Sequence, residues 1–239
     1  GLDAQWKNNE IQGFNFLLPE YQSANYAIFA IHEFEASKQN LWTLGLRFDY
    51  GTIDMEGYYD PNLYEFLIGN NQSEETATAY AQRSQDLNRD FTSFNARVGW
   101  DHQFNDQFSS KVNLGTAFRL PTAIELGANG IHHGSFRHEQ GDPNLDPEQG
   151  FMADVSLNYS ENSWNINLSP YAYFFSNYIF LRPSGTFSLL PHSGQLYSYT
   201  ESEALLTGLE LKIDKEIGRW HFGVAGEYLY NQQLTSSRS

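Results

Sequence analysis

The sequence predicts an all-β fold: an antiparallel transmembrane β-barrel segment of about eight strands, with short periplasmic turns and long extracellular loops. Three observations predict it. Apolar and polar residues alternate along many segments, which is the period of a β-strand with two unlike faces. Aromatic residues, which favour strands, make up 16% of the chain. The connections between these segments alternate between short and long, as they do in barrels that span membranes.

The first four strands are expected at residues 25–37, 42–50, 94–101 and 111–119. The clearest alternation runs from Trp42 to Tyr50, where every second residue is aromatic or leucine. The third and fourth segments alternate in the same way. The first is apolar on both faces in its middle, so its pattern is the least regular of the four.

The last four strands are expected at residues 154–159, 164–169, 209–214 and 220–230. Short turns join consecutive strands in pairs, at residues 38–40, 104–107, 160–163 and 216–218. The other connections, residues 54–90, 120–149 and 183–198, are long. Long loops in a compact domain usually have a function, so we expect these three to be extracellular and to form a mouth.

The two faces of the expected strands differ in chemistry. One face holds Trp, Leu, Phe, Val and Tyr, and the other holds charged residues and Asn. Arg or Lys on a lipid-facing position costs about 2–4 kcal/mol at the membrane midplane, so the charged face is expected to line a wet lumen. A soluble β-sandwich, such as a carbohydrate-binding module, gives the same alternation with its polar face in solvent. That alternative stays open, and the loop lengths favour the barrel.

Composition excludes several other classes of protein. Acidic residues number 29 against 14 Lys and Arg, a net charge of −15, so nucleic acid is not an expected partner. The chain has no cysteine, which excludes disulfides and thiolate metal sites. No apolar run approaches the roughly 20 residues of a membrane-spanning helix.

One segment, residues 115–149, reads GTAFRLPTAIELGANGIHHGSFRHEQGDPNLDPEQ and resembles a motif of TonB-dependent outer-membrane receptors. The matching positions are Phe118, Arg119, Pro121, Thr122, Glu125, Leu126, Gly130, His132, Glu139, Gly141, Leu145, Pro147 and Glu148. Ser135 and Asp142 depart mildly from the family pattern, which has Thr and Asn there. Shorter matches near Gly45, Arg83, Asn177 and Thr207 extend the resemblance over most of the chain.

The resemblance implies that residues 1–239 are a partial barrel, without the plug domain and the remaining strands of such receptors. It places the chain in the bacterial outer membrane, against lipid and lipopolysaccharide, with the TonB complex reached through the missing plug. The implied function is to form barrel wall and ligand mouth for active uptake of a metal or metal chelate of the siderophore, haem or zinc class.

Within the motif, Arg119, Glu125 and Glu148 are expected to structure the loop rather than contact ligand. Arg119 ends a predicted strand with its side chain facing inward, where Glu125, Glu139 or Glu148 is available to neutralise it. A charge-assisted hydrogen bond there is worth about 1.5–3 kcal/mol when it is shielded from water.

The candidate metal ligands are His132, His133, His138 and Glu139, in the second long loop. Imidazole and carboxylate groups suit zinc, copper, nickel and iron, and the pattern resembles that of zinc and iron-chelate receptors. The alternative is that these histidines hydrogen-bond the loop backbone. No resident cofactor is expected; a divalent metal or an iron chelate is the expected transported ligand.

The first long loop, residues 54–90, is acidic, with eight Asp and Glu against Arg83 and Arg89. Such a vestibule concentrates cations; a plain solvated loop, or one bridged to lipopolysaccharide by divalent ions, explains the same charge. Its aromatic residues, Tyr58, Tyr59, Tyr64 and Phe66, are suited to stacking on a ligand or to packing the loop itself.

No motif indicates catalysis. Glu74 and Glu75 are neighbours in sequence, which does not place them across a scissile bond. Ser193-Gly194 lacks the surroundings of a nucleophile elbow, and no phosphate-binding glycine loop is present. We therefore expect no enzyme activity, and a metal-dependent enzyme is the most distant alternative.

Overall fold

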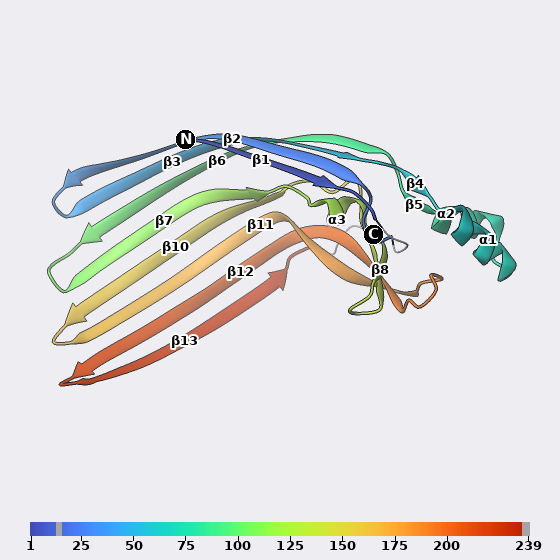
Figure 1. The fold of residues 1–239 in the computed structure, drawn as a ribbon. Helices are drawn as coiled ribbons and strands as arrows, with labels where there is room; N and C mark the ends of the chain where they lie inside the picture. Colours follow the sequence, from blue (N-terminus) through green and yellow to red (C-terminus); the bar gives the residue numbers. More distant parts are fainter. Residues whose placement is uncertain (13–15, 236–239) are drawn as a thin grey trace.

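A computed structural model describes residues 1–12 and 16–235. Within them one curved sheet of eleven strands forms the wall, and its strands run obliquely from tight turns at one end to the loops at the other (Figure 1). The long wall strands are β1 (Leu2–Asn9), β2 (Tyr21–Ser37), β3 (Asn40–Met55), β6 (Leu87–Gln103), β7 (Phe108–Arg119), β10 (Glu148–Glu161), β11 (Trp164–Phe187), β12 (Gln195–Ile217) and β13 (Trp220–Gln233).

Neighbouring wall strands pair antiparallel, and their register places apolar residues beside apolar residues. Phe48 on β3 lies opposite Ile28 on β2 and opposite Phe94 on β6. All three side chains are at least 44% exposed. Side chains opposite one another in a ladder cover a common patch. One face of this wall is therefore a continuous apolar surface.

The opposite, concave face is polar, and several of its charges form ion pairs. Arg47 Nη2 lies 2.8 Å from Asp49 Oδ1 and 3.1 Å from Asp3 Oδ2. Lys111 Nζ lies 3.2 Å from Asp101 Oδ2 on the neighbouring strand. The predicted difference between the two faces is thus present in the described sheet. A sandwich needs a second sheet packed on the first, and the only other described sheet is the two-stranded β4–β5 pair.

The prediction of eight strands is wrong. The sheet also contains β1, which has only Leu2, Ala4 and Trp6 before a run of polar residues, too short a pattern to indicate a strand. It is not closed: within the described residues β1 pairs with β2 and β13 pairs with β12, and neither has a second neighbour. The strands also extend far beyond their alternating centres.

The predicted long loops contain much regular structure. Residues 54–90 fold into β4 (Tyr58–Tyr59), α1 (Pro61–Gly69), α2 (Glu74–Ala81) and β5 (Gln82–Ser84), and then enter β6. Residues 120–149 form α3 (Ala123–Gly127), β8 (Asn129–His132) and β9 (Arg137–Gln140). The predicted loop 183–198 shrinks to residues 188–194, because β11 and β12 pair as far as Phe187 and Gln195.

Side-chain caps fix the three helices. The Asp60 carboxylate accepts a hydrogen bond from Leu63 N at the start of α1, where Pro61 occupies the first turn. Ser73 caps α2 in the same way, and Thr122 caps α3. In the described part of the chain, no helix combines the length and apolar character needed to cross a membrane.

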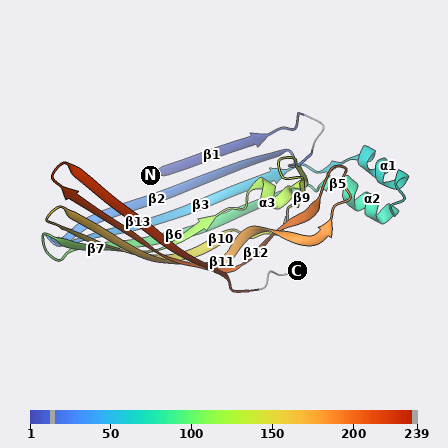
Figure 2. The same cartoon turned by 90° about the horizontal axis from the view of Figure 1, so that it is seen from below.

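Two hydrophobic clusters hold the loops together. The first lies where the loops meet the wall: Ile53, Met55, Phe91, Ala123, Leu126, Leu145 and Ile179. The second lies farther out and takes residues from all three predicted loops: Leu63, Leu67, Ala77 and Leu190, with Tyr64, Tyr80 and Ile131 packed against them. The loops therefore share a core of their own and form one cap at the end of the wall, with α1 and α2 at its far tip (Figure 2).

The β8–β9 hairpin joins this cap to the wall. Strand β9 pairs in parallel with the start of β12, where Leu196 lies opposite His138. Farther along β12, from Ala204 to Ile217, β13 is the neighbour. The second predicted loop, residues 120–149, is thus hydrogen-bonded to β12, the strand that follows the third predicted loop.

Candidate ligand-binding mouth

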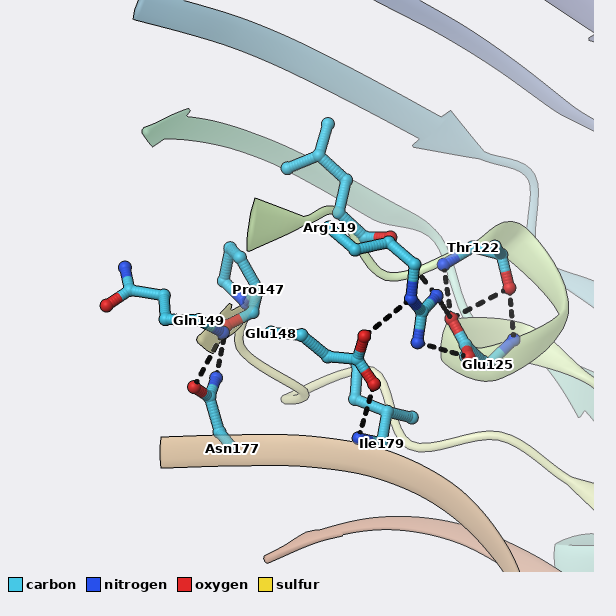
Figure 3. Close-up of polar contacts among 9 residues, drawn as sticks. Arg119, Thr122, Glu125, Pro147, Glu148, Gln149, Asn177 and Ile179 are labelled. Atoms are coloured by element: carbon cyan, nitrogen blue, oxygen red, sulfur yellow. Dashed lines mark hydrogen bonds and ion pairs between the residues drawn. The ribbon is translucent and has the colours of Figure 1, made fainter. Parts of the chain in front are cut away.

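Arg119, the last residue of β7, ion-pairs with two carboxylates at the base of the cap (Figure 3). Its Nε lies 2.7 Å from Glu148 Oε2. Its Nη1 and Nη2 lie 2.8 and 2.9 Å from the two oxygens of Glu125. The guanidinium therefore joins the end of a strand, the first turn of α3 and the start of β10.

Each of the two carboxylates is also bonded to backbone. Glu125 Oε2 accepts from Thr122 N at 2.7 Å, and Thr122 Oγ1 accepts from Glu125 N at 3.4 Å, which completes a capping box. Glu148 Oε1 accepts from Ile179 N at 2.7 Å, next to the irregular pairing between Phe175 and Tyr178. Both carboxylates are buried, and their charges are compensated by Arg119 and by N–H donors.

Asn177 extends the same cluster along β11. Its side-chain amide donates to Pro147 O, and its Oδ1 accepts from Gln149 N at 3.2 Å (Figure 3). The path of the chain from α3 to β10 is therefore held by side chains on three elements. The sequence indicated Glu125, Glu139 or Glu148 as the partner of Arg119. In the structure, Glu125 and Glu148 are its partners.

Glu139 lies instead in a second charged group on the hairpin. Its Oε1 lies 2.6 Å from Arg137 Nε and 2.9 Å from His132 Nδ1, and the residue is 1% exposed. A carboxylate bonded to one ring nitrogen orients an imidazole and leaves its other nitrogen available. His132 itself is half exposed.

His138 points to the other side of β9, into the cap. Its Nε2 is 2.7 Å from Asn129 Oδ1, its Nδ1 is 2.8 Å from Ser188 Oγ, and it is 3% exposed. Burial, with a smaller contribution from the positive charge of Arg83, lowers the pKa of His138 to about 4. The neutral imidazole therefore joins the second and third loops.

The four predicted metal ligands thus lie in separate surroundings. His132 and Glu139 are bonded to each other, His138 uses both ring nitrogens in hydrogen bonds, and His133 lines a cavity. Among the described residues, no three His, Cys, Asp or Glu side chains gather in a group that could hold a metal. Metal binding by the predicted set stays a prediction.

A cavity of about 690 Å³ opens between the cap and the segment that leads into β2. All three predicted loops line it: the first contributes Tyr58 and Arg83, the second contributes His133, and the third contributes His192. The rings of Phe16 and Tyr58 stack in its wall, with centroids 5.4 Å apart. Its size is that of a site for a small organic ligand or chelate.

Sequence reasoning missed two polar residues of this cavity. Arg83 was noted as part of the family resemblance and of the charge of an acidic loop, with no binding role assigned, yet it is 6% exposed and bonded to backbone carbonyls. His192 has φ of 61°, a left-handed conformation that the sequence does not reveal. Arg83 and His192 are far apart in the chain, and no local pattern could have brought them together.

The family model "TonB dependent receptor-like, beta-barrel" matches residues 3–239. The copper transporter OprC shares 18% identity, with a TM-score of 0.69 over 92% of this chain and 31% of that chain. The hemophore receptor HasR of Serratia marcescens, solved with its hemophore HasA and haem, shares 17% identity, with a TM-score of 0.68 over 92% of this chain and 36% of that chain. The alcaligin outer-membrane receptor FauA of Bordetella pertussis gives a TM-score of 0.54 at 12% identity, over 90% of this chain and 31% of that chain.

The family model covers nearly the whole chain, and a β-barrel wall is the class of fold that the alternating sheet and its cap of loops indicate. The chain belongs to the TonB-dependent receptor β-barrel family. The family is one of transport receptors. The chain spans about a third of the length of the solved structures that it matches.

Proposed function

We propose that this chain forms barrel wall and ligand mouth in a bacterial outer-membrane receptor that takes up a metal or a metal chelate of the siderophore, haem or zinc class. The observation that supports it best is the cavity of about 690 Å³, which all three loops line at the end of the wall away from the tight turns. The names of the similar structures, a copper transporter and receptors for haem and alcaligin, support the ligand class.

The open sheet supports a place within a larger barrel. The edges at β1 and β13 present unpaired backbone groups, which pair readily with further strands. In this proposal other strands close the wall around a plug, and the plug connects the receptor to the TonB complex. Hydrocarbon would cover the apolar face, because exposed aliphatic and aromatic rows of this extent need a nonpolar surrounding. Lipopolysaccharide would surround the outer rim.

Metal accumulation by whole cells tests the proposal. Cells that express the complete receptor, and cells that lack its gene, are starved with a chelator and then supplied with copper, zinc, a ferric siderophore or haem. We expect one of these sources to restore cellular metal, measured by mass spectrometry, and a protonophore to abolish the gain. Equal metal contents in both strains for every source, or a receptor absent from the outer-membrane fraction, would contradict the proposal.

Metal binding by His132 and His133, which the sequence predicts, is tested separately on the purified complete receptor. Zinc is titrated into the wild type and into a variant with both His132→Ala and His133→Ala, with His221→Ala on the wall as the matched control. We expect the double variant alone to lose affinity. Unchanged affinity in the double variant would remove these two histidines from the ligand set.

A further inference from the structure

The cavity in the cap contains a buried cation that has no carboxylate partner. Arg83, the middle residue of β5, is 6% exposed and lines the cavity. Its Nε donates to Asn129 O at 3.0 Å, and its Nη2 donates to Asn129 O and, at 3.4 Å, to Phe16 O. Within the described residues it forms no ion pair, and no hydrogen bond from its Nη1 is present.

This arrangement is unusual because burying a charge is costly unless an opposite charge accompanies it. Burial lowers the pKa of Arg83, while the negative charge of Asp60 acts in the opposite direction. The carbonyl groups of Asn129 and Phe16 supply partial negative charge only. The ring of Phe16 adds a cation–π contact, at 5.3 Å from its centroid.

Glu20, Glu56 and Asp60 line the same cavity, and within the described residues none of them forms an ion pair with Arg83. Asp60 accepts from Leu63 N as the cap of α1, and Glu20 accepts from Ile11 N at 3.0 Å. Arg119 and Arg47, by contrast, each have two acidic partners. Unlike these two arginines of the wall, Arg83 has no acidic partner in the described part of the chain. A bound anion would compensate its buried positive charge.

The surroundings of Arg83 indicate the body of the ligand. Phe16 and Tyr58 stack almost in parallel, with 15° between their planes, and both line the cavity. Phe66 contributes another aromatic ring to the lining. His133 and His192 add ring nitrogens that can donate hydrogen bonds. Flat aromatic walls favour a planar, unsaturated ligand.

We propose that this cavity binds a ligand with a planar aromatic body and a carboxylate, and that Arg83 is the anchor for the carboxylate. The inference rests on the proposed receptor function for the placement of the cavity at the ligand-facing end, and it adds the charge and shape of the ligand. Guanidinium groups recognise carboxylates through charge-assisted hydrogen bonds. The available Nη1 supplies a donor that no described group uses.

The test is binding of two matched probes, 4-fluorobenzoate and 4-fluorobenzamide, to the purified complete receptor, followed by fluorine NMR. The probes share ring and shape and differ in charge. We expect 4-fluorobenzoate to bind at least about tenfold more tightly, the factor that one charge-assisted contact supplies. Arg83→Gln should abolish this preference, and Arg83→Lys should keep part of it.

Arg89→Gln is the matched control. Arg89 lies at the start of β6, donates to Pro143 O and Leu145 O, and does not line the cavity. This variant should keep the wild-type preference. Equal binding of the two probes by the wild type, or no binding of either, would overturn the proposal whether or not Arg83→Gln folds. Acetate that displaces 4-fluorobenzoate at equal concentration would overturn the aromatic requirement.

The outcome is independent of the uptake experiment. A preference for 4-fluorobenzoate that depends on Arg83, in a receptor that accumulates no metal, would leave the anion site standing and remove the transport function. Metal uptake by a receptor that shows no preference for 4-fluorobenzoate would support the transport function and overturn the anion site.

Discussion

Arg119 and Glu148 lie opposite one another in the register of β7 and β10, and their side chains meet at 2.7 Å between Nε and Oε2. The backbone pairing of β7 with β10 and the side-chain ion pair therefore hold the same two residues together. Because Glu148 also accepts from Ile179 N, this single carboxylate links three consecutive wall strands where they enter the cap.

Arg119→Gln should destabilise the base of the cap. The change leaves the buried carboxylates of Glu125 and Glu148 without their cation, at a cost of about 1.5–3 kcal/mol in the free energy of unfolding, because Arg119 itself is partly exposed. Urea unfolding of the complete receptor in detergent measures it. Arg97→Gln, on the neighbouring strand and without an ion pair in the described structure, should have little effect. Equal losses in the two variants would contradict a structural role for the pair.

Thr122→Ala should weaken the start of α3. It removes the hydroxyl that caps Glu125 N, a loss of about 1 kcal/mol in unfolding free energy for a typical cap. Thr122→Ser keeps the hydroxyl and should recover most of that stability. Backbone amide exchange at residues 123–127 is the direct readout, and equal exchange rates in the two variants would refute the cap.

Acidification should loosen the cap through His138. The pKa of His138 is lowered to about 4 in the folded state from its usual 6.5, so the unfolded chain takes up the proton first as the pH falls. Stability is therefore complete above pH 6.5, declines between 6.5 and about 4, and falls no further below that; the total loss is about 3 kcal/mol at 1.36 kcal/mol per pKa unit.

Unfolding free energies measured from pH 8 to pH 4 test this dependence. His138→Gln should flatten the profile, because the amide keeps hydrogen-bonding capacity and does not titrate. His221→Gln, exposed on β13, is the control and should leave the profile unchanged. A wild-type profile that is already flat would contradict the assignment of His138 as a buried neutral group.

Gly141→Ala should displace the loop after β9. A Cβ at this position would lie 2.6 Å from Gly127 N and 2.7 Å from Leu126 C, both of which are backbone atoms that cannot move independently. We expect a loss of about 1–3 kcal/mol in unfolding stability, as for other overpacked sites. Gly134→Ala, whose nearest neighbour would be 3.9 Å away, should be neutral. Thermal unfolding of both variants compares them, and a neutral Gly141→Ala would show that the loop can shift.

The sequence predicted the centres of the strands well and their ends poorly. Alternation is strong where one face of the sheet is apolar and the other is polar, as at residues 42–50. Toward the cap the alternating pattern disappears, although β11 and β12 continue to pair as far as Phe187 and Gln195. The two helices in the first loop have recognisable starts, Asp60-Pro61 and Ser73-Glu74, but their short length hides any apolar period.

For the site, the sequence indicated the residue types but not their partners. It offered three glutamates to Arg119, and the choice between them depends on the register of β7 with β10 and on the first turn of α3. It grouped four metal-ligand candidates because they are close in sequence. In a strand, neighbours point to opposite sides, and for that reason His138 and Glu139 face different environments.

The parallel pairing of β9 with β12 limits how far the wall can grow. The hairpin occupies the edge of β12 at residues 196–198, so a longer β13 would run into it soon after passing Ala204. The height of the barrel rim on this side is therefore set by an inserted loop rather than by the β-forming tendency of the last strand. A β13 that grew past residues 199–203 of β12 would have to displace the hairpin to add a further rung.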